Sequence, residues 1–455
     1  MSASFTPTPP LPSYQGRNWL AAKLPDTACN WLDNAPGNWQ LVGPAQPALT
    51  DQLLRLADPV AWQWPEQLVV FITDLHADAE ALSASLVASG LFARHGPAPG
   101  DLTPVCHMPA FEIIIGGDCL DKGPANLPLL RLIRQLIDWQ IPLTLLSGNH
   151  DLRLQLAIQS LKQPDCSRNG HFLLRLGSKI MPFCVELLSE YPLSTEELQK
   201  LPTEAECRQI LLPSEDWPDR FRQAATSHLS PAQINLELER LEARKQRFFQ
   251  AATTASLTLQ QIYAALQRWQ QQFMEPDGEF YWFTERQQLL CRRGSFVFVH
   301  AGCDDSMAQR LAREDWQTLN SDFQVARQGE AFSLYFGPLG NMLRTKYRRQ
   351  DPPLTASSRQ ALHQAGIHAL VHGHRNLHQG QRITFRANMI HFECDVTLNQ
   401  VSRQQETLQG SGAAVTLFYP QGWVVGISSD APAAKCFSPQ GLHKLATQLY
   451  TDSTK

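Results

Sequence analysis

Short runs of aliphatic and β-branched residues, each ending in a polar cluster, constrain the fold of this chain most strongly. LVVFITD, FEIIIGGD and IPLTLLSGN lie within residues 68–149, and SFVFVHAG and HALVHGH lie within residues 295–374. Helical stretches such as LPLLRLIRQLIDW, with apolar residues three and four apart, separate the first runs. This alternation predicts buried, largely parallel strands in a layered α/β fold.

The middle of the chain has helical periodicity in place of strand-like runs. Apolar residues from Leu259 to Phe273 recur at spacings of three and four, as one face of an amphipathic helix requires. An earlier helical segment follows Ser230 and Pro231, a typical N-cap and first helical position. We therefore expect a large helical insertion, which contains a long hairpin and covers part of the core as a cap.

These differences in sequence pattern divide the chain into five parts. The first is rich in proline and in tryptophan, which is costly to leave in water, so we expect it to pack on the core. The predicted parts are an N-terminal extension (1–66), the first part of the core (67–166), the helical insertion or cap (167–290), the second part of the core (291–430) and a C-terminal tail (431–455).

Composition excludes several classes of protein. The chain has 455 residues, of which 43% are hydrophobic and 18% charged, as in a soluble globular protein. A net charge of -4 gives no indication of a nucleic-acid partner, and no run approaches the ~20 apolar residues that cross a membrane. Ten cysteines without CxxC pairs indicate reduced thiols, so we expect a cytoplasmic protein.

Side chains that can bind metal ions follow all five strand-like runs. They are Asp74, His76, Asp118, Asp121, Asn149, His150, His300 and His374. In open α/β sheets ligands bind beyond the carboxyl ends of the strands, so we expect these residues to converge on one crevice. Carboxylate, imidazole and amide groups together suit manganese, iron or zinc.

The order of these motifs is DxH, GDxxD, GNH[DE] and two later histidine motifs, and it resembles the calcineurin-like metallophosphoesterases. The resemblance covers residues 69–151 and 295–375. It implies an α/β fold in which a layered β-sandwich core has helices on the outside, with the helical insertion added to it.

The resemblance also implies a centre of two divalent ions, with manganese expected and iron or zinc as alternatives. The first ion would be bound by Asp74 and His76, and Asp118 would bridge the two ions. The second ion would be bound by Asn149, His300 and His374. A hydroxide between the ions would attack phosphorus. His150 would protonate the leaving oxygen, with Asp121 orienting its ring.

Two further segments are closest to the phosphoprotein phosphatase branch of this superfamily. GDCLDKGP resembles its GDxxDRG motif, with Lys122 in place of the arginine, and GPLGNMLRTKY resembles a segment that supplies a second phosphate-binding arginine. Lys122 and Arg344 are therefore candidate substrate-binding residues. Lysine keeps the positive charge but loses the bidentate contact with phosphate.

The last histidine motif allows two alignments. In the first, Gly373 and His374 form the motif and His374 is the ligand. In the second, His372 and His374 have the HxH spacing of many phosphodiesterases, but Val371 then replaces the glycine. We favour the first alignment.

These features predict hydrolysis of a phosphate monoester, on a phosphoprotein or a small phosphorylated metabolite. One alternative is a dinucleoside polyphosphate hydrolase or a phosphodiesterase. Another is a metal-binding scaffold without catalysis. The sequence indicates neither the natural substrate nor an oligomeric state.

Overall fold

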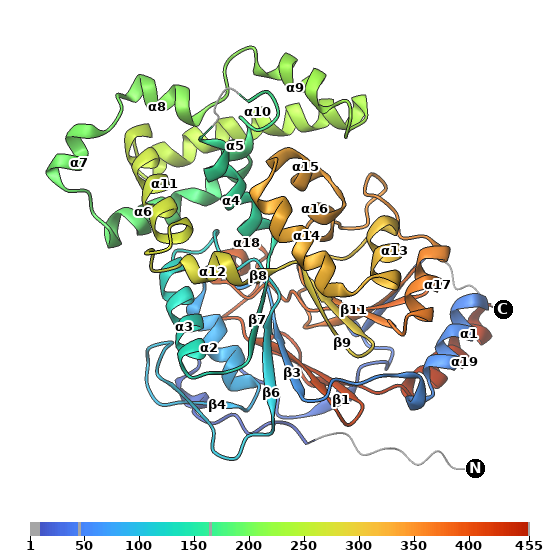
Figure 1. The fold of residues 1–455 in the computed structure, drawn as a ribbon. Coiled ribbons are helices and arrows are strands. Elements are labelled where there is room, and N and C mark those ends of the chain that lie inside the picture. Colours follow the sequence, from blue (N-terminus) through green and yellow to red (C-terminus); the bar gives the residue numbers. More distant parts are fainter. Residues whose placement is uncertain (1–9, 44–46, 163–165, 454–455) are drawn as a thin grey trace, which may run out of the picture.

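Two large β-sheets form the centre of the protein (Figure 1). The structure is a computed structural model, and it describes residues 10–43, 47–162 and 166–453. One sheet has eight strands and the other has six, and a small hairpin of β4 (Phe92–Arg94) and β5 (Leu102–Pro104) lies apart from both.

The eight-stranded sheet combines a parallel half with an antiparallel half. Its order is β1 (Ala28–Asn30), β16 (Ala434–Phe437), β15 (Trp423–Ser428), β14 (Ala414–Tyr419), β3 (Leu68–Ile72), β6 (Phe111–Ile115), β7 (Leu143–Leu146) and β8 (Gln287–Gln288). Strands β3, β6, β7 and β8 are parallel, and β14 joins them antiparallel to β3. The predicted parallel strands are therefore present.

The six-stranded sheet is mixed in the same way. Its order is β2 (Trp39–Val42), β12 (Arg382–Arg386), β13 (Met389–Glu393), β11 (Ala369–His372), β10 (Phe296–Val299) and β9 (Leu290–Arg293). Strands β10, β11 and β13 are parallel to one another. The carboxyl ends of β10 and β11 therefore lie at one edge of this sheet.

Alternating residues of each strand face two different cores. Val69 and Phe71 of β3 belong to the core between the sheets, where the Phe71 ring centroid lies 5.5 Å from that of Phe298 on β10. Val70 and Ile72 belong to the core under the outer helices. Burial on both faces explains why these strands are continuously apolar, and it confirms the predicted β-sandwich core with outer helices.

Helices cover the outer faces of the sandwich (Figure 1). On the side of the larger sheet they are α2 (Ala79–Ala88), α3 (Asn126–Asp138) and α4 (Asn149–Ser160). After β10 come α13 (Asp305–Arg313), α14 (Trp316–Gln328), α15 (Ala331–Phe336), α16 (Pro338–Met342) and α17 (Ala356–Gln364). The remaining helices outside the insertion are η1 (Arg17–Trp19), α1 (Pro47–Leu56), η2 (Pro59–Ala61), α18 (Gln400–Gln405) and α19 (Gly441–Ser453), of which α1 packs against α19.

A block of helices stands between α4 and β8 and lies at the top of Figure 1. Its elements are α5 (Phe172–Leu176), η3 (Gly177–Ile180), α6 (Met181–Glu190), α7 (Thr195–Lys200), α8 (Glu204–Leu211), α9 (Trp217–Ala225), α10 (Pro231–Thr254), α11 (Leu259–Met274) and α12 (Tyr281–Arg286). The two helices predicted here are confirmed, because Ser230 caps α10 and Thr258 caps α11 through their side chains. The apolar face of α11 is buried from Leu259 to Phe273.

Both ends of the described chain contribute to the sheets. Strands β1 and β2 come from the segment expected to be an N-terminal extension, and each pairs at the edge of a different sheet. The segment 431–455, expected to be a tail, supplies β16 and α19. Among the described residues, no helix combines the length and the apolar character needed to cross a membrane.

Candidate active site

The site lies beyond the carboxyl ends of five strands, and both sheets contribute to it. Asp74 follows β3, Asp118 follows β6 and Asn149 follows β7 in the larger sheet, while His300 follows β10 and His374 follows β11 in the smaller sheet. Since parallel strands end at one edge, the two edges together bring these side chains to one place. All of them except His374 are less than 9% exposed.

Asp118 is at the centre of the cluster. Its carboxylate lies 3.4 Å from His300 Nε2, 3.6 Å from His76 Nε2 and 3.9 Å from His150 Nε2. Its Oδ1 also accepts a hydrogen bond of 2.8 Å from the His150 amide. One carboxylate therefore faces three imidazoles from three different segments.

Three groups of side chains have the spacing to hold a metal ion. The first group is Asp74, His76 and Asp118, and the second is Asp118, His300 and His374. The third group is His76, Asp121 and His150. The first two groups share Asp118, as expected for two ions with a bridging carboxylate. Asn149 lies beside the second group, with its Oδ1 3.2 Å from His300 Nε2.

Hydrogen bonds set the tautomers of two of these histidines. His300 Nδ1 donates to the Gly116 carbonyl at 2.8 Å, and His374 Nε2 donates to the Arg344 carbonyl at 3.1 Å. A carbonyl only accepts, so each bonded nitrogen carries a proton, and the other nitrogen has a free lone pair when the ring is neutral. His300 Nε2 and His374 Nδ1 are then the nitrogens that could bind a metal ion.

His150 and Asp121 form a buried pair beside the cluster. His150 Nδ1 donates to Asp121 Oδ2 at 2.6 Å. The other carboxylate oxygen, Asp121 Oδ1, is buried and has no hydrogen-bond partner among the described residues. The same is true of His76 Nδ1, which lies 3.9 Å away from it. His150 Nε2 remains directed toward Asp118 and the cavity.

The electrostatics of the cluster fit bound cations. Burial and the nearby charge of Asp395 raise the pKa of Asp74 to about 8, and burial raises the pKa of Asp121 to about 7. Burial also acts on Asp118, but the charges of His300 and His150 outweigh it and lower its pKa well below the usual value. Buried carboxylates with raised pKa values have too little positive charge around them, and divalent ions would supply it.

The backbone of the site occupies an uncommon conformation. Seven non-glycine residues here have φ between 45° and 67°, in the left-handed region. They are Asp74, His76, Ala77, Asp118, Asp121, Lys122 and His374. Such residues are uncommon and cluster at functional sites, where the surrounding structure holds them.

Two glycines allow the loops to approach this closely. A Cβ on Gly373 would lie 1.8 Å from Asp74 Oδ2, and a Cβ on Gly148 would lie 2.1 Å from Asp118 Oδ1. Asp151 then ties two loops together, because its carboxylate accepts hydrogen bonds from the amides of Gly148, Cys119 and Leu120. Asp151 therefore serves the loops and not the cavity.

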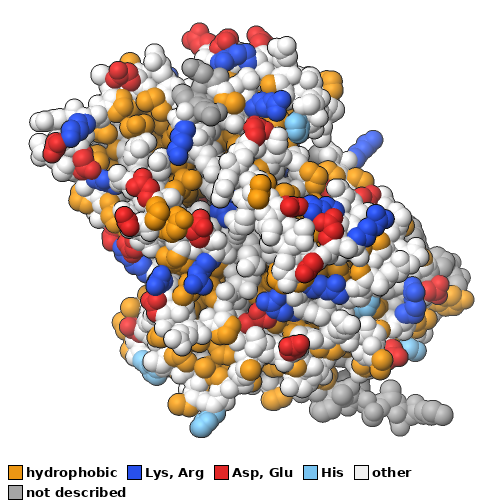
Figure 2. Space-filling view, in the orientation of Figure 1, with side chains coloured by type: hydrophobic (Ala, Val, Ile, Leu, Met, Phe, Trp, Pro, Cys, Tyr) orange, Lys and Arg blue, Asp and Glu red, His pale blue; other side chains and the backbone are white. Residues whose placement is uncertain are grey.

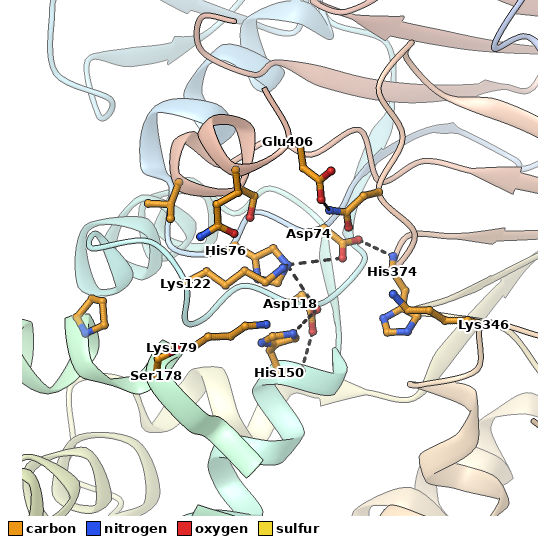
Figure 3. Close-up of a pocket in the computed structure, with 15 residues that line it drawn as sticks. Asp74, His76, Asp118, Lys122, His150, Ser178, Lys179, Lys346, His374 and Glu406 are labelled. Carbon is orange, nitrogen blue, oxygen red and sulfur yellow. Dashed lines mark hydrogen bonds and ion pairs between the residues drawn. The ribbon is translucent and has the colours of Figure 1, made fainter. Parts of the chain in front are cut away.

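A cavity of about 560 Å³ opens onto the cluster. Figure 3 shows Lys122 and Lys179 extending toward His76 and His150, and Lys346 beside His374. Lys122 Nζ donates to His76 Nε2 at 2.6 Å. The full lining is Asp74, His76, Asp118, Lys122, His150, Ser178, Lys179, Pro182, Lys346, His374, Asn376, Val401, Ser402, Gln405 and Glu406.

The sequence did not point to several of these residues. Lys179 lies in η3 of the helical block, and Lys346 follows α16, so neither is near a strand end. Asp395 is buried, and its charge raises the pKa of Asp74. It stands two residues after β13, so the rule that ligands follow strand ends could have found it.

Arg344 and His372 lie outside the cavity lining in the described chain. The Arg344 guanidinium stacks over the Tyr335 ring, with its Cζ 4.3 Å from the centroid, although its backbone carbonyl contacts His374. His372 bonds His391 at 3.2 Å and belongs to none of the three metal-binding groups. This geometry favours the alignment in which His374 is the ligand.

Comparison with known proteins identifies one family and several remote structures. Residues 68–217 match the family model described as calcineurin-like phosphoesterase, and no curated protein matches the chain. A cold-active protein tyrosine phosphatase structure shares 11% identity over 84% of this chain and 83% of its own, with a TM-score of 0.43.

Two further phosphatase structures are similar over most of their length. A cold-active protein-tyrosine phosphatase of a psychrophile, Shewanella sp., shares 10% identity over 83% of this chain and 84% of its own, with a TM-score of 0.40. A protein serine/threonine phosphatase from Saccharomyces cerevisiae shares 11% identity over 82% of each chain, with a TM-score of 0.34. The match identifies residues 68–217 as a calcineurin-like phosphoesterase segment, which supports a hydrolase that acts on phosphoric ester bonds.

Proposed function

We propose that this protein hydrolyses phosphate monoesters, on a phosphoprotein or a small phosphorylated metabolite. One observation supports this most strongly: a single cavity holds the Asp118 cluster, the imidazole of His150 and three lysines. A volume of about 560 Å³ suits a phosphorylated side chain or a small phosphorylated molecule.

Two divalent ions would occupy the centre, and we propose manganese because the ligands combine carboxylate, amide and imidazole groups. We propose that Asp74 and His76 bind the first ion and that Asp118 bridges the two ions. Asn149, His300 and His374 are the proposed ligands of the second ion. Such ions supply Lewis acidity and positive charge to a phosphoryl group.

His150 is the proposed general acid. Its Nδ1 proton is held by Asp121 at 2.6 Å, so Nε2 is the nitrogen that can carry a proton to the leaving oxygen. Burial and the positive charge of Arg153 lower the pKa of His150 well below its usual value. Proton donation requires the imidazolium form, and the hydrogen bond to the Asp121 carboxylate favours that form.

The charge around the cavity supports a monoester in preference to a diester. A monoester presents one more anionic oxygen, and Lys122, Lys179 and Lys346 all line the cavity. Charge-assisted hydrogen bonds from such groups are the stronger ones. Arg344, the second candidate substrate-binding residue, reaches the cavity only if its side chain leaves the Tyr335 ring.

The same lysines also suit a chain of phosphates, so a dinucleoside polyphosphate hydrolase remains the alternative activity. A phosphodiesterase is the other enzymatic alternative. A metal-binding scaffold without catalysis is disfavoured because the proposed acid and all six proposed ligands lie together.

We also propose a cytoplasmic protein that does not bind nucleic acid. All ten cysteines lie among the described residues and none forms a disulfide, which suits a reducing compartment. On the face drawn in Figure 2, acidic and basic side chains are interspersed, and a nucleic-acid surface would need a basic stripe.

The test compares p-nitrophenyl phosphate with bis(p-nitrophenyl) phosphate on manganese-loaded protein. We expect kcat/KM to favour the monoester by about tenfold, the value of one charge-assisted contact. Lys346→Met should narrow this preference, whereas Lys444→Met, an exposed lysine on α19, should leave it unchanged. A preference for the diester in the wild type would overturn the monoester assignment.

A further inference from the structure

Four arginines converge around Tyr335, where the helical block meets the rest of the protein. Arg153 comes from α4, Arg175 from α5, Arg244 from α10, and Arg344 follows α16. Helix α5 packs against both α4 and α10, and α15, which carries Tyr335, packs against α4 (Figure 1). We call these four residues the arginine cluster.

Two members of the arginine cluster share the same aromatic rings. Arg175 Cζ lies 4.9 Å and Arg344 Cζ 4.3 Å from the centroid of the Tyr335 ring. The same two atoms lie 5.0 Å and 5.6 Å from the centroid of Phe336. Both guanidinium groups therefore contact the same pair of aromatic rings, which attract each cation but accept no hydrogen bond in the plane of the guanidinium.

The arginine cluster has fewer hydrogen-bond acceptors than donors among the described residues. In the described part of the chain, only Arg175 has a carboxylate within 4 Å, that of Glu237 at 2.8 Å. Arg175 is 3% exposed, and its Nη2 is buried without a hydrogen-bond partner. Arg244 Nη1 and Arg344 Nε are also buried without partners. Buried donors are nearly always satisfied in proteins, so three such nitrogens in one place call for an acceptor.

The titration behaviour of two neighbours indicates the same excess of positive charge. Burial and then the charges of Arg175 and Arg153 lower the pKa of Arg244 to about 10. Burial would raise the pKa of Tyr335, but the charges of Arg175, Arg344 and Arg153 outweigh it and lower that pKa to about 8. An anion at this position would relieve both effects.

The arginine cluster is adjacent to the catalytic cavity. Arg153 Nε donates to the Asn149 carbonyl at 2.9 Å, one turn of α4 from His150, and its charge lowers the pKa of His150. The Arg344 carbonyl accepts the His374 hydrogen bond. The arginine cluster and the Asp118 cluster are therefore joined through the backbone of Asn149 and of Arg344.

We propose that the arginine cluster binds a second phosphate group, so that the preferred substrates carry two phosphates and one of them is hydrolysed in the cavity. The hydrolysis of one phosphate in the cavity rests on the proposed function. Guanidinium groups match a phosphate in charge and geometry, and three of them have nitrogens without acceptors. Free inorganic phosphate has the same chemistry, so the experiments must separate the two sources.

The first experiment titrates the full-length, metal-loaded protein with inorganic phosphate by calorimetry. We expect two equivalents, one in the cavity and one at the arginine cluster. Arg244→Gln should retain only one, whereas Arg247→Gln, an exposed arginine on the same helix, should retain both. A single equivalent in the wild type, or two in Arg244→Gln, would overturn the site.

A stability measurement distinguishes a binding role of Arg244 from a structural one. Arg244→Gln removes a cation that lacks a carboxylate partner, so without phosphate its Tm should equal or exceed that of the wild type. The rise in Tm on adding phosphate should be smaller than in the wild type. A lower Tm without phosphate, with an unchanged phosphate response, would show that Arg244 is structural and contradict the proposal.

The second experiment identifies the source of the phosphate. KM is measured for alkanediol bisphosphates of increasing chain length and for the matching alkyl monophosphates. We expect KM to be lowest at one chain length, by about tenfold against the monophosphate, and Arg244→Gln to abolish this optimum. If two phosphates bind in the titration but KM has no optimum in chain length, the arginine cluster binds free phosphate. That result would overturn the substrate assignment.

Hydrolysis of p-nitrophenyl phosphate reports on the catalytic half separately. If two phosphates bind but no ester is hydrolysed, the proposed function fails and the anion site stands. If the aryl ester is hydrolysed while only one phosphate binds and no chain length is preferred, the arginine cluster has no ligand and the further proposal fails.

Discussion

The strand-end cluster and the helical block build charged sites in different ways. At the strand ends, short side chains are positioned by the backbone that carries them: Asp74, Asp118 and His374 all have positive φ, and each lies one to three residues after its strand. In the helical block, Lys179, Arg175 and Arg244 are long side chains on helices. Packing alone brings Lys179 to the cavity and the two arginines to the arginine cluster.

The difference teaches where chemistry and specificity are encoded. Ligands that must meet within a few ångströms need a rigid frame, which paired strands and strained turns provide. Groups that recognise the rest of a substrate tolerate looser placement, so an inserted block can supply them. We therefore expect changes at the strand ends to affect metal content and kcat, and changes in the helical block to affect KM.

The largest expected effect is that of Asp118→Ala. This carboxylate belongs to both groups that would each hold an ion, so its loss should empty both sites and reduce hydrolysis below detection. Asp74→Ala, which touches one group, should retain more metal. Elemental analysis after reconstitution with manganese measures both. A wild type that binds no metal under the same conditions would refute the two-metal centre.

His150→Asn should reduce turnover by about 10³ on alkyl phosphates while metal content stays unchanged. The reason is that an alkoxide needs a proton, and an asparagine cannot donate one as an imidazolium does. Aryl phosphates, with better leaving groups, should lose less. Single-turnover kinetics on the two esters gives the comparison, and equal losses on both would exclude His150 as the acid.

Two carboxylates with lowered pKa values allow a test of pH dependence in each region. Burial would raise the pKa of Glu393, but the charges of His372, Arg375 and Arg382 outweigh it and lower that pKa to about 2. Arg175 does the same for the partly buried Glu237 in the helical block. A depressed pKa contributes stability above the unfolded value near 4.5, lost as pH falls toward 2.

Each glutamate-to-glutamine variant should therefore lose about 3 kcal/mol of unfolding free energy at pH 7. The loss should shrink between pH 4.5 and 2. Urea unfolding at several pH values measures this difference. A loss that does not change with pH would show that packing, and not the charge of the carboxylate, accounts for the effect.

Lys179→Met should raise KM for monoesters by about tenfold and leave metal content unchanged. Lys179 lines the cavity but comes from the helical block, so it can contact substrate without contributing to the proposed metal shell. The matched control is Lys200→Met, an exposed lysine on α7. If Lys179→Met lowered metal content instead, the hypothesis that the strand ends bind metal and the helical block binds substrate would be wrong.

The smallest expected effect concerns Lys122, which belongs to the strand-end region. Its ammonium donates to His76 Nε2, the nitrogen that would bind a metal, and one lone pair cannot serve both. Lys122→Met should therefore tighten metal binding by about fivefold, the factor that ~1 kcal/mol represents. Calorimetric titration with manganese tests this, and weaker binding would show that Lys122 supports the metal shell.

The sequence alone was sufficient for the fold class and for the composition of the strand-end cluster. Continuous apolar runs such as LVVFI predict strands buried on both faces, and the two cores on either side of β3 explain that pattern. Residues such as Asp74 and Asn149 could be found because each follows its strand directly, where position along the chain determines position in space.

Tertiary structure decided what surrounds the cluster. Lys179, Arg175 and Arg244 lie on helices whose periodicity indicates only which face is buried, and nothing local specifies which neighbour a long side chain meets. The same holds for Arg344, whose motif suggested substrate binding, while the packing of α15 places its guanidinium over Tyr335. Site residues at strand ends can be predicted from the sequence because their positions depend on local geometry. Contacts between the inserted helices and the core depend on how the whole chain packs.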